Sequence, residues 1–131
     1  SYLGGMKNLL PLCVLMLAGC QPDETLTAYA DGQSVFVLQS IDDTAFNATA
    51  IIDISEAGKI SGQAPCNRYF ATQSTPYPWF EAGPIGATRM ACDSLSAETV
   101  FFTALSDMTL AEVVGDTLIL SNDNGREMVF Q

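Results

Sequence analysis

The chain has 131 residues, of which 48% are hydrophobic, so it is long enough and apolar enough to form one small domain with its own core. Fifteen acidic residues against five basic ones give a net charge of −10, and the absence of histidine excludes Ser-His-Asp and Cys-His catalytic sites. Because polyanion binding needs clustered cations, and the basic residues after the N-terminal region are scattered singly, the composition also excludes a nucleic-acid partner.

The N-terminal region has the order of parts that is typical of a secretory signal. From Met6 it has a short charged segment, an almost wholly apolar run over residues 9–17 and then small residues. This run is much shorter than the roughly 20 residues that span a bilayer, and Pro11 lies within it, so we expect a cleaved signal peptide over residues 6–19. Residues 1–5 precede the signal and are interpreted as an expression remnant or a misplaced start.

The signal ends in residues 17–20 (LAGC), which resemble a bacterial lipobox. In lipoproteins of this kind the cysteine is acylated and becomes the first mature residue, so Cys20 is the expected site of lipid attachment, palmitate included. Several acyl chains are needed for stable anchoring, because each buried methylene contributes about 0.8 kcal/mol and a single acyl chain holds a protein on the membrane only reversibly. Gln21 stands where inner-membrane retention would place Asp, so the resemblance implies an outer-membrane anchor facing the periplasm. The polar residues 20–33 are predicted to form a lipid-anchored tether.

The first half of the remaining chain is predicted to consist of strands. Residues 35–41 are rich in β-branched and aromatic residues and end at the turn signal Asp42-Asp43. Residues 48–54 and 59–61 flank a second turn signal and predict a hairpin. Residues 67–72 predict a further strand, which leaves the turn that contains Cys66.

The second half contains the predicted helix. Asp93 or Ser94 is well placed as its N-cap, and apolar residues at helical spacing carry it to about residue 108. Three short apolar segments separated by turn residues then predict a meander at the C-terminal end. The sequence therefore predicts an α+β, β-rich domain over residues 34–131, with a curled, mostly antiparallel sheet packed around one α-helix. The expected apolar stripe of the helix consists of Ala97, Phe101, Ala104, Leu105 and Met108.

Two cysteine motifs stand out in this domain, because residues 58–62 (GKISG) are followed by 66–69 (CNRY) and residues 88–92 read TRMAC. With the positions around them, these motifs resemble the META-domain family, the HslJ-like lipoproteins of bacterial envelopes, and so imply a META-domain-like fold. The chain departs from the family pattern at Phe36, where tryptophan is usual, and at Pro65, where a glycine usually precedes the first cysteine. The match spans residues 35–130, and its further positions are Leu38, Ser40, Ile41, Glu98, Phe101, Leu105, Leu118, Leu120, Gly125, Met128 and Phe130.

The resemblance implies a small envelope protein linked to stress resistance, surface maintenance or secretion, without an agreed enzymatic activity. We therefore predict a non-enzymatic, monomeric, lipid-anchored protein that binds another envelope component and uses no cofactor. One alternative is an acidic inhibitor of a basic cell-wall hydrolase such as lysozyme, with association steered by charge. A further alternative is a carrier of a small hydrophobic ligand, which requires the sheet to enclose an apolar cavity.

Cys66 and Cys92 are predicted to form a disulfide, because the expected compartment is oxidising. Closing this loop would stabilise the fold by about 3.5 kcal/mol in the chain-entropy model. A thiol oxidoreductase is the alternative, in which Arg68 or Arg89 would lower the pKa of a neighbouring thiol. Two cysteines without histidine leave a tetrahedral zinc site short of ligands, so no metal site is predicted.

The candidate partner-binding residues are Asn67, Arg68, Tyr77 and Arg89. Asn67 is also expected to satisfy backbone groups in its turn, and Tyr69 to pack inside. In the aromatic stretch 77–80 (YPWF) we expect Tyr77 to be exposed and Trp79 to lie in the core. Glu98, in the first turn of the helix, favours the helix macrodipole and could pair with Arg68 or Arg89.

Overall fold

The computed structural model describes residues 24–30 and 32–131, and the predicted signal peptide and Cys20 lie outside the described residues. A short 3-10 helix, η1, begins the described chain, and one α-helix, α3, lies among nine strands. Their bounds are η1 Leu26–Tyr29, β1 Val35–Ile41, β2 Thr44–Ala45, β3 Ile51–Asp53, β4 Lys59–Gln63, β5 Arg68–Thr72, β6 Gly86–Ala87, α3 Leu95–Asp107, β7 Leu110–Val114, β8 Thr117–Ser121 and β9 Glu127–Phe130.

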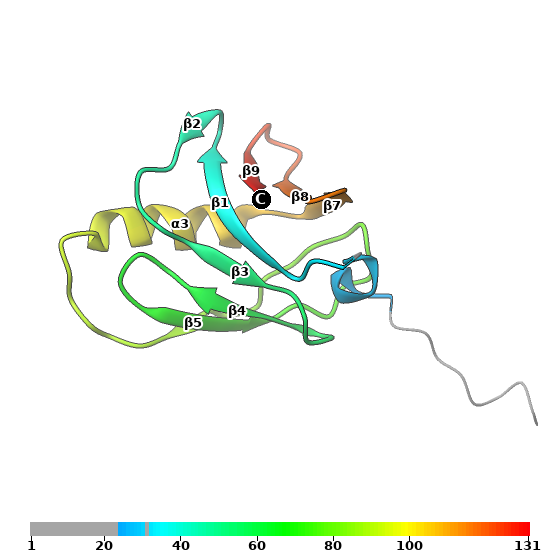
Figure 1. Ribbon diagram of the computed structural model, residues 1–131, viewed down its shortest axis with the longest axis horizontal. Coiled ribbons are helices and arrows are strands. Elements are labelled where there is room, and N and C mark those ends of the chain that lie inside the picture. The colour runs from blue at the N-terminus through cyan, green and yellow to red at the C-terminus, as the bar shows by residue number, and fades with distance from the viewer. Residues whose placement is uncertain (1–23, 31) are drawn as a thin grey trace, which may run out of the picture.

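The strands form one antiparallel sheet that curls around α3 (Figure 1). Their order is β6-β5-β4-β3-β1-β9-β8-β7, with the short β2 paired to β1. The predicted hairpin is β3 and β4, and the predicted meander is β7, β8 and β9. The prediction of a curled antiparallel sheet around one helix is therefore confirmed.

Strand β1 joins the two halves of the sheet. Its residues 35–37 pair with β3, and its later residues pair with β9. Phe36 and Leu38 point into the core at the two-residue period of a strand, but the next buried residue is Ile41 instead of residue 40. The register with β9 shifts between Leu38 and Ser40, and this bulge changes the phase of the side chains and bends the sheet around the helix.

The interior between the sheet and α3 is filled by side chains of the protein itself. Phe101 and Leu105 of α3 are fully buried, and the Tyr69 ring packs edge-on against Phe101 with centroids 5.4 Å apart. The predicted helical stripe is confirmed for its last four residues, whereas Ala97 is half-buried. This packing argues against the enclosed ligand cavity that a hydrophobic carrier would need.

The residues before β1 are partly folded onto the domain. Leu26 of η1 is buried in the core, and the carbonyl of Glu24 accepts a 2.7 Å hydrogen bond from the N–H of Tyr77. The tether predicted over residues 20–33 therefore includes a segment that packs on the domain.

The predicted environments of the two large aromatic residues were wrong. Trp79 is 58% exposed, whereas Tyr77 is half-buried, stacked on Tyr29 at 4.1 Å, and its hydroxyl accepts a hydrogen bond from the N–H of Val113. The reason is the pairing of Trp79 with Leu110 at the edge of β7. Neighbouring residues of an extended segment point to opposite sides, so the burial of the next residue turns the Trp79 ring outward.

The segment that contains Trp79 links the β7 edge of the sheet to β5. Its Phe80 N–H donates to the Thr109 carbonyl at 2.9 Å beside β7, and its Gly83 N–H donates to the Thr72 carbonyl of β5 at 2.9 Å. The buried Gln73 side chain holds the middle of the segment, because its Oε1 accepts a 2.8 Å hydrogen bond from the N–H of Glu81. Residues 80–83 are thereby fixed shortly before β6.

Arg126 connects three turns near the C-terminal end of α3. Its guanidinium donates to Asp42 after β1, with Nη2 at 3.0 Å, and to Asp107 at the end of α3, with Nη1 at 2.9 Å. The N–H of Glu127 and the Arg126 guanidinium both hydrogen-bond the Asp42 carboxylate and hold its pKa below the ordinary value.

Gly62 in β4 is expected to tolerate no side chain, because a Cβ there would collide with the carbonyl oxygen of Ile51 on β3. Its φ of +156° is also a conformation that L residues rarely adopt. Gly62→Ala should therefore lower the free energy of unfolding by about 3 kcal/mol or more, measured by urea denaturation.

The matched control is Gly58→Ala, since Gly58 has a φ of +79° but nothing within 4 Å of an added Cβ. Gly58→Ala should lower the free energy of unfolding by only about 1 to 2 kcal/mol, which is the cost of a left-handed backbone conformation for a residue with a Cβ. Equal losses in the two variants would contradict a steric role for Gly62.

Candidate functional site

The buried carboxylate of Glu98 binds the turn that precedes β5. It lies in the first turn of α3 and is 6% exposed. Its Oε1 accepts hydrogen bonds from the N–H groups of Cys66 at 2.9 Å and Asn67 at 2.8 Å, and its Oε2 accepts one from Nδ2 of Asn67 at 2.8 Å. Three N–H donors compensate the burial of the negative charge, so Glu98 fixes this turn against the start of the helix.

Asn67 extends this network to the loop after β6. Its Oδ1 accepts hydrogen bonds from the N–H of Met90 at 2.6 Å and from Oγ1 of Thr88 at 2.9 Å, and its Nδ2 also donates to the Met90 carbonyl at 3.1 Å. The side chain is 2% exposed, and all its polar atoms are satisfied. The prediction that the Asn67 side chain satisfies backbone groups of its own turn was wrong, because its backbone partners among the described residues are the N–H and carbonyl of Met90, 23 positions away.

The Cys66–Cys92 disulfide closes the same arrangement, with the two Cα atoms 5.8 Å apart. The predicted disulfide is thus present. The disulfide fixes the end of the loop 88–92 at Cys92, and Asn67 holds the middle of the same loop at Met90. Residues 88–92 are therefore attached to the turn before β5 by a covalent bond and by hydrogen bonds.

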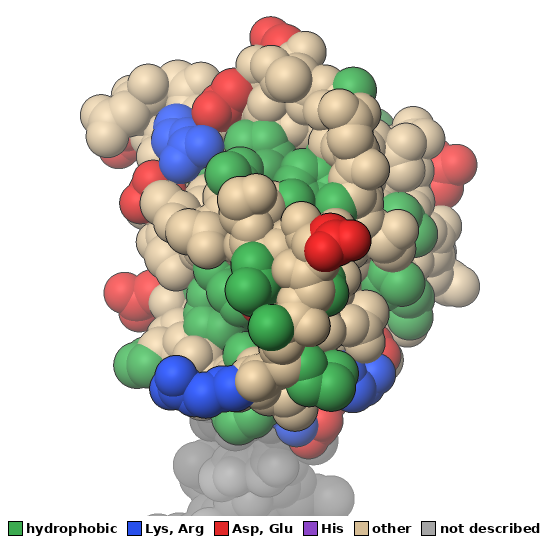
Figure 2. All heavy atoms as spheres, turned by 90° about the vertical axis from the view of Figure 1, so that its left-hand side faces the viewer, with side chains coloured by type: hydrophobic (Ala, Val, Ile, Leu, Met, Phe, Trp, Pro, Cys, Tyr) green, Lys and Arg blue, Asp and Glu red, His purple; other side chains and the backbone are tan. Residues whose placement is uncertain are grey.

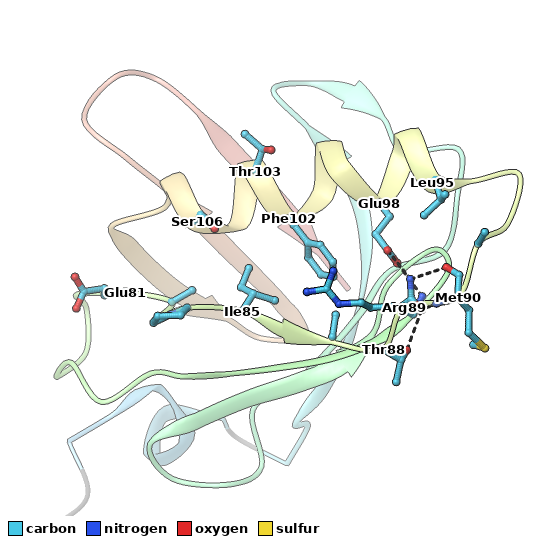
Figure 3. A pocket seen from close by; sticks show the side chains of 16 residues that line it. Glu81, Ile85, Thr88, Arg89, Met90, Leu95, Glu98, Phe102, Thr103 and Ser106 are labelled. Carbon is cyan, nitrogen blue, oxygen red and sulfur yellow. Dashed lines mark hydrogen bonds between the residues drawn. The ribbon is translucent and has the colours of Figure 1, made fainter.

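An open groove of about 960 Å³ lies between α3 and the chain that runs past β6 (Figure 3). One wall is the helix and the other is the stretch 81–91, with β6 at its centre. Most of its lining side chains are apolar, with a few hydroxyl groups among them, and Glu81 and Arg89 lie at separate places along its length. The lining residues with larger side chains are Glu81, Ile85, Thr88, Arg89, Met90, Leu95, Phe102, Thr103 and Ser106.

The groove reaches the end of the molecule at which α3 begins, because Leu95, the first residue of α3, lines it. Figure 2 shows apolar side chains gathered along the middle of this end and basic side chains near its lower edge. Met90 is 62% exposed at the groove rim, and Leu95 on the helix is also exposed. A smaller pocket of about 380 Å³, lined by Phe46 and Val100 among others, lies at the same end of α3.

The structure brings together only part of the predicted partner-binding set. Asn67 and Arg89 both line the groove, Asn67 as a buried support and Arg89 as an exposed cation whose side chain extends along it (Figure 3). Arg68 is exposed at the start of β5 but does not line the groove. Tyr77 lies elsewhere, between Tyr29 and β7.

Glu98 has other partners than those considered from the sequence. Within the described part of the chain it forms no ion pair with Arg68 or Arg89, because N–H groups occupy both carboxylate oxygens. Phe102 and Ile85 were not predicted as site residues. The sequence did contain an indication for Phe102. It follows Phe101 but lies outside the apolar stripe that faces the core, so its large apolar side chain must contact something other than the centre of the core.

The residues described here contain no group of three or more Cys, His, Asp or Glu side chains that could hold a metal ion. None of the helices among residues 24–30 and 32–131 is long and apolar enough to cross a membrane.

The protein is thus a small domain in which one antiparallel sheet curls around one α-helix and a disulfide fixes a loop beside the helix. The model of the META domain matches residues 25–131, and the chain belongs to the META-domain family. A protein from Burkholderia xenovorans, solved by NMR, is similar, with a TM-score of 0.61, 24% identity and coverage of 86% of this chain and 92% of that one. A second NMR structure has a TM-score of 0.58 and 19% identity, with coverage of 75% and 87%. No curated protein matches the sequence.

Glu98→Gln is expected to lower the free energy of unfolding by about 1 to 3 kcal/mol, because a buried hydrogen-bond donor would then face a donor. In either orientation the new amide NH₂ points at Nδ2 of Asn67 or at the two backbone N–H groups. Urea denaturation of the oxidised protein measures the loss.

The control is Glu112→Gln, because Glu112 is exposed on β7. This change should alter stability by less than about 0.5 kcal/mol. The network has no special role if both variants unfold at the same urea concentration.

Proposed function

We propose that this protein is a non-enzymatic, lipid-anchored protein of the bacterial cell envelope whose META domain binds another envelope component through the groove beside α3. The observation that carries the proposal is the construction of this groove. Its loop wall is held by Glu98, Asn67 and the Cys66–Cys92 disulfide, while Arg89 and Met90 remain exposed on it. A preorganised groove with exposed contact groups lowers the entropy lost on binding.

The disulfide supports a location outside the cytoplasm. Bonds of this kind persist in the periplasm and in other oxidising compartments, whereas cytosolic thiols are kept reduced. The bond agrees with the secretory signal expected over residues 6–19 and with acylation of Cys20. On this proposal the lipid anchors the protein to the outer membrane, facing the periplasm.

A contact role also accounts for the chemistry of the site. The buried carboxylate is fully occupied by N–H donors, and both cysteines are bonded to each other, so neither is free as a base or a nucleophile. Binding in the groove would serve stress resistance or surface maintenance by stabilising or retaining the envelope component.

Photo-crosslinking in a Gram-negative host tests the proposal. Benzoylphenylalanine at Met90, on the groove rim, should give a discrete adduct in the membrane fraction when the full chain is expressed. The same residue at Val114, which is 54% exposed on β7 and outside the groove, should give none. Cys20→Ala should move the protein out of the membrane fraction and reduce the Met90 adduct. The same adducts from both positions, or none from either, would contradict a binding role for the groove.

A further inference from the structure

The strand β6 has one paired edge and one edge that faces the groove. It pairs antiparallel with β5 through Tyr69 opposite Ala87 and Phe70 opposite Gly86, and the N–H of Thr88 donates to the Arg68 carbonyl at 3.1 Å. Hydrogen-bonded and non-hydrogen-bonded pairs alternate in such a ladder. The backbone N–H and carbonyl of Ala87 therefore point away from β5, and Ala87 lines the groove on that side.

The two sides of β6 differ in access. On the outer face of the sheet the Phe70 ring lies against Gly86, where a Cβ would come within 2.6 Å of the ring. On the opposite edge the space between β6 and α3 is the open groove of about 960 Å³. An incoming chain thus has room beside the edge of β6, with the side chains of Ile85 and Phe102 available for apolar contact.

The charges along the groove indicate what such a chain would carry. Arg89 is exposed and, among the residues that the structure describes, makes no ion pair, whereas Glu81 lies exposed towards the other end (Figure 3). The third charged lining residue, Glu98, already has both carboxylate oxygens hydrogen-bonded to N–H groups of the protein, so it does not select the charge of an incoming chain. The complement is a chain with a carboxylate near Arg89 and a basic group near Glu81.

We infer that the groove binds an extended peptide segment, which adds as a strand to the free edge of β6 and places an acidic side chain against Arg89. This inference rests on the proposed binding function and names the chemical class of its partner. Main-chain hydrogen bonds to Ala87 supply affinity that does not depend on sequence, and Arg89, Glu81 and the apolar wall select the side chains. The short length of β6 keeps this edge from pairing indiscriminately.

The test uses a random octapeptide library selected against the full-length protein in mild detergent. Selected peptides should alternate β-branched with other residues and carry an acidic residue towards one end. Arg89→Glu should weaken a selected synthetic peptide at least about tenfold, since a charge-assisted hydrogen bond is lost, and lysine in place of its acidic residue should restore binding. Lys59→Glu is the matched control, because Lys59 is an exposed cation outside the groove, and it should leave affinity unchanged within about twofold.

Backbone pairing is tested separately by Ala87→Pro. Proline removes the N–H that points into the groove but leaves the pairing with β5, so the variant should keep its urea midpoint and lose the peptide. Failure to enrich any peptide, or affinities unchanged by both Arg89→Glu and Ala87→Pro, would overturn the inference. If the Met90 crosslink still formed in that case, the groove would bind a partner of other chemistry, and only the strand-addition inference would fail.

Discussion

The buried carboxylate of Glu98 is the interaction on which the rest of the site depends. A charge removed from water is tolerated only with full hydrogen bonding, and here the donors come from the turn at Cys66 and Asn67. The turn must therefore stay against the first turn of α3. Once it is held there, Asn67 can reach the backbone of Met90, and Cys66 can bond to Cys92. The Glu98 carboxylate binds only the turn at Cys66 and Asn67, but through this turn it sets the position of the loop that forms one wall of the groove.

The curled sheet supports this arrangement from behind. The bulge in β1 turns the sheet around α3, and Gly62 allows β4 to approach β3 closely enough to continue that curvature. The stretch 80–83 then bonds to Thr109 beside β7 and to Thr72 of β5 and, with Gln73, holds the chain shortly before β6. The groove lies where the sheet does not close, between its β6 edge and the helix. The groove therefore exists because the sheet does not close around the helix, and the hydrogen bonds of the stretch 80–83 keep this opening in place.

How much of the structure could be predicted from the sequence depends on whether a feature leaves a recognisable pattern in the sequence or depends on contacts between distant positions. The helix stripe at Phe101 and Leu105, the C-terminal meander and the disulfide were predictable because they depend on local periodicity, turn residues and compartment. The partners of Glu98 were not, since its hydrogen bonds span 31 and 32 positions and involve backbone groups that carry no sequence signature. Trp79 was placed wrongly because its strand-like phase is set by one bridge to Leu110, which no local pattern reveals.

The central claim is that the Glu98 carboxylate and the disulfide hold the same turn, and a double-mutant cycle on the free energy of unfolding tests it most directly. The cycle combines Glu98→Gln with the paired change Cys66→Ala and Cys92→Ala. Because loss of the disulfide frees the turn that Glu98 binds, the double variant should be more stable than the sum of the separate losses predicts, by at least about 0.5 kcal/mol. Losses that add to within about 0.3 kcal/mol would contradict a shared role.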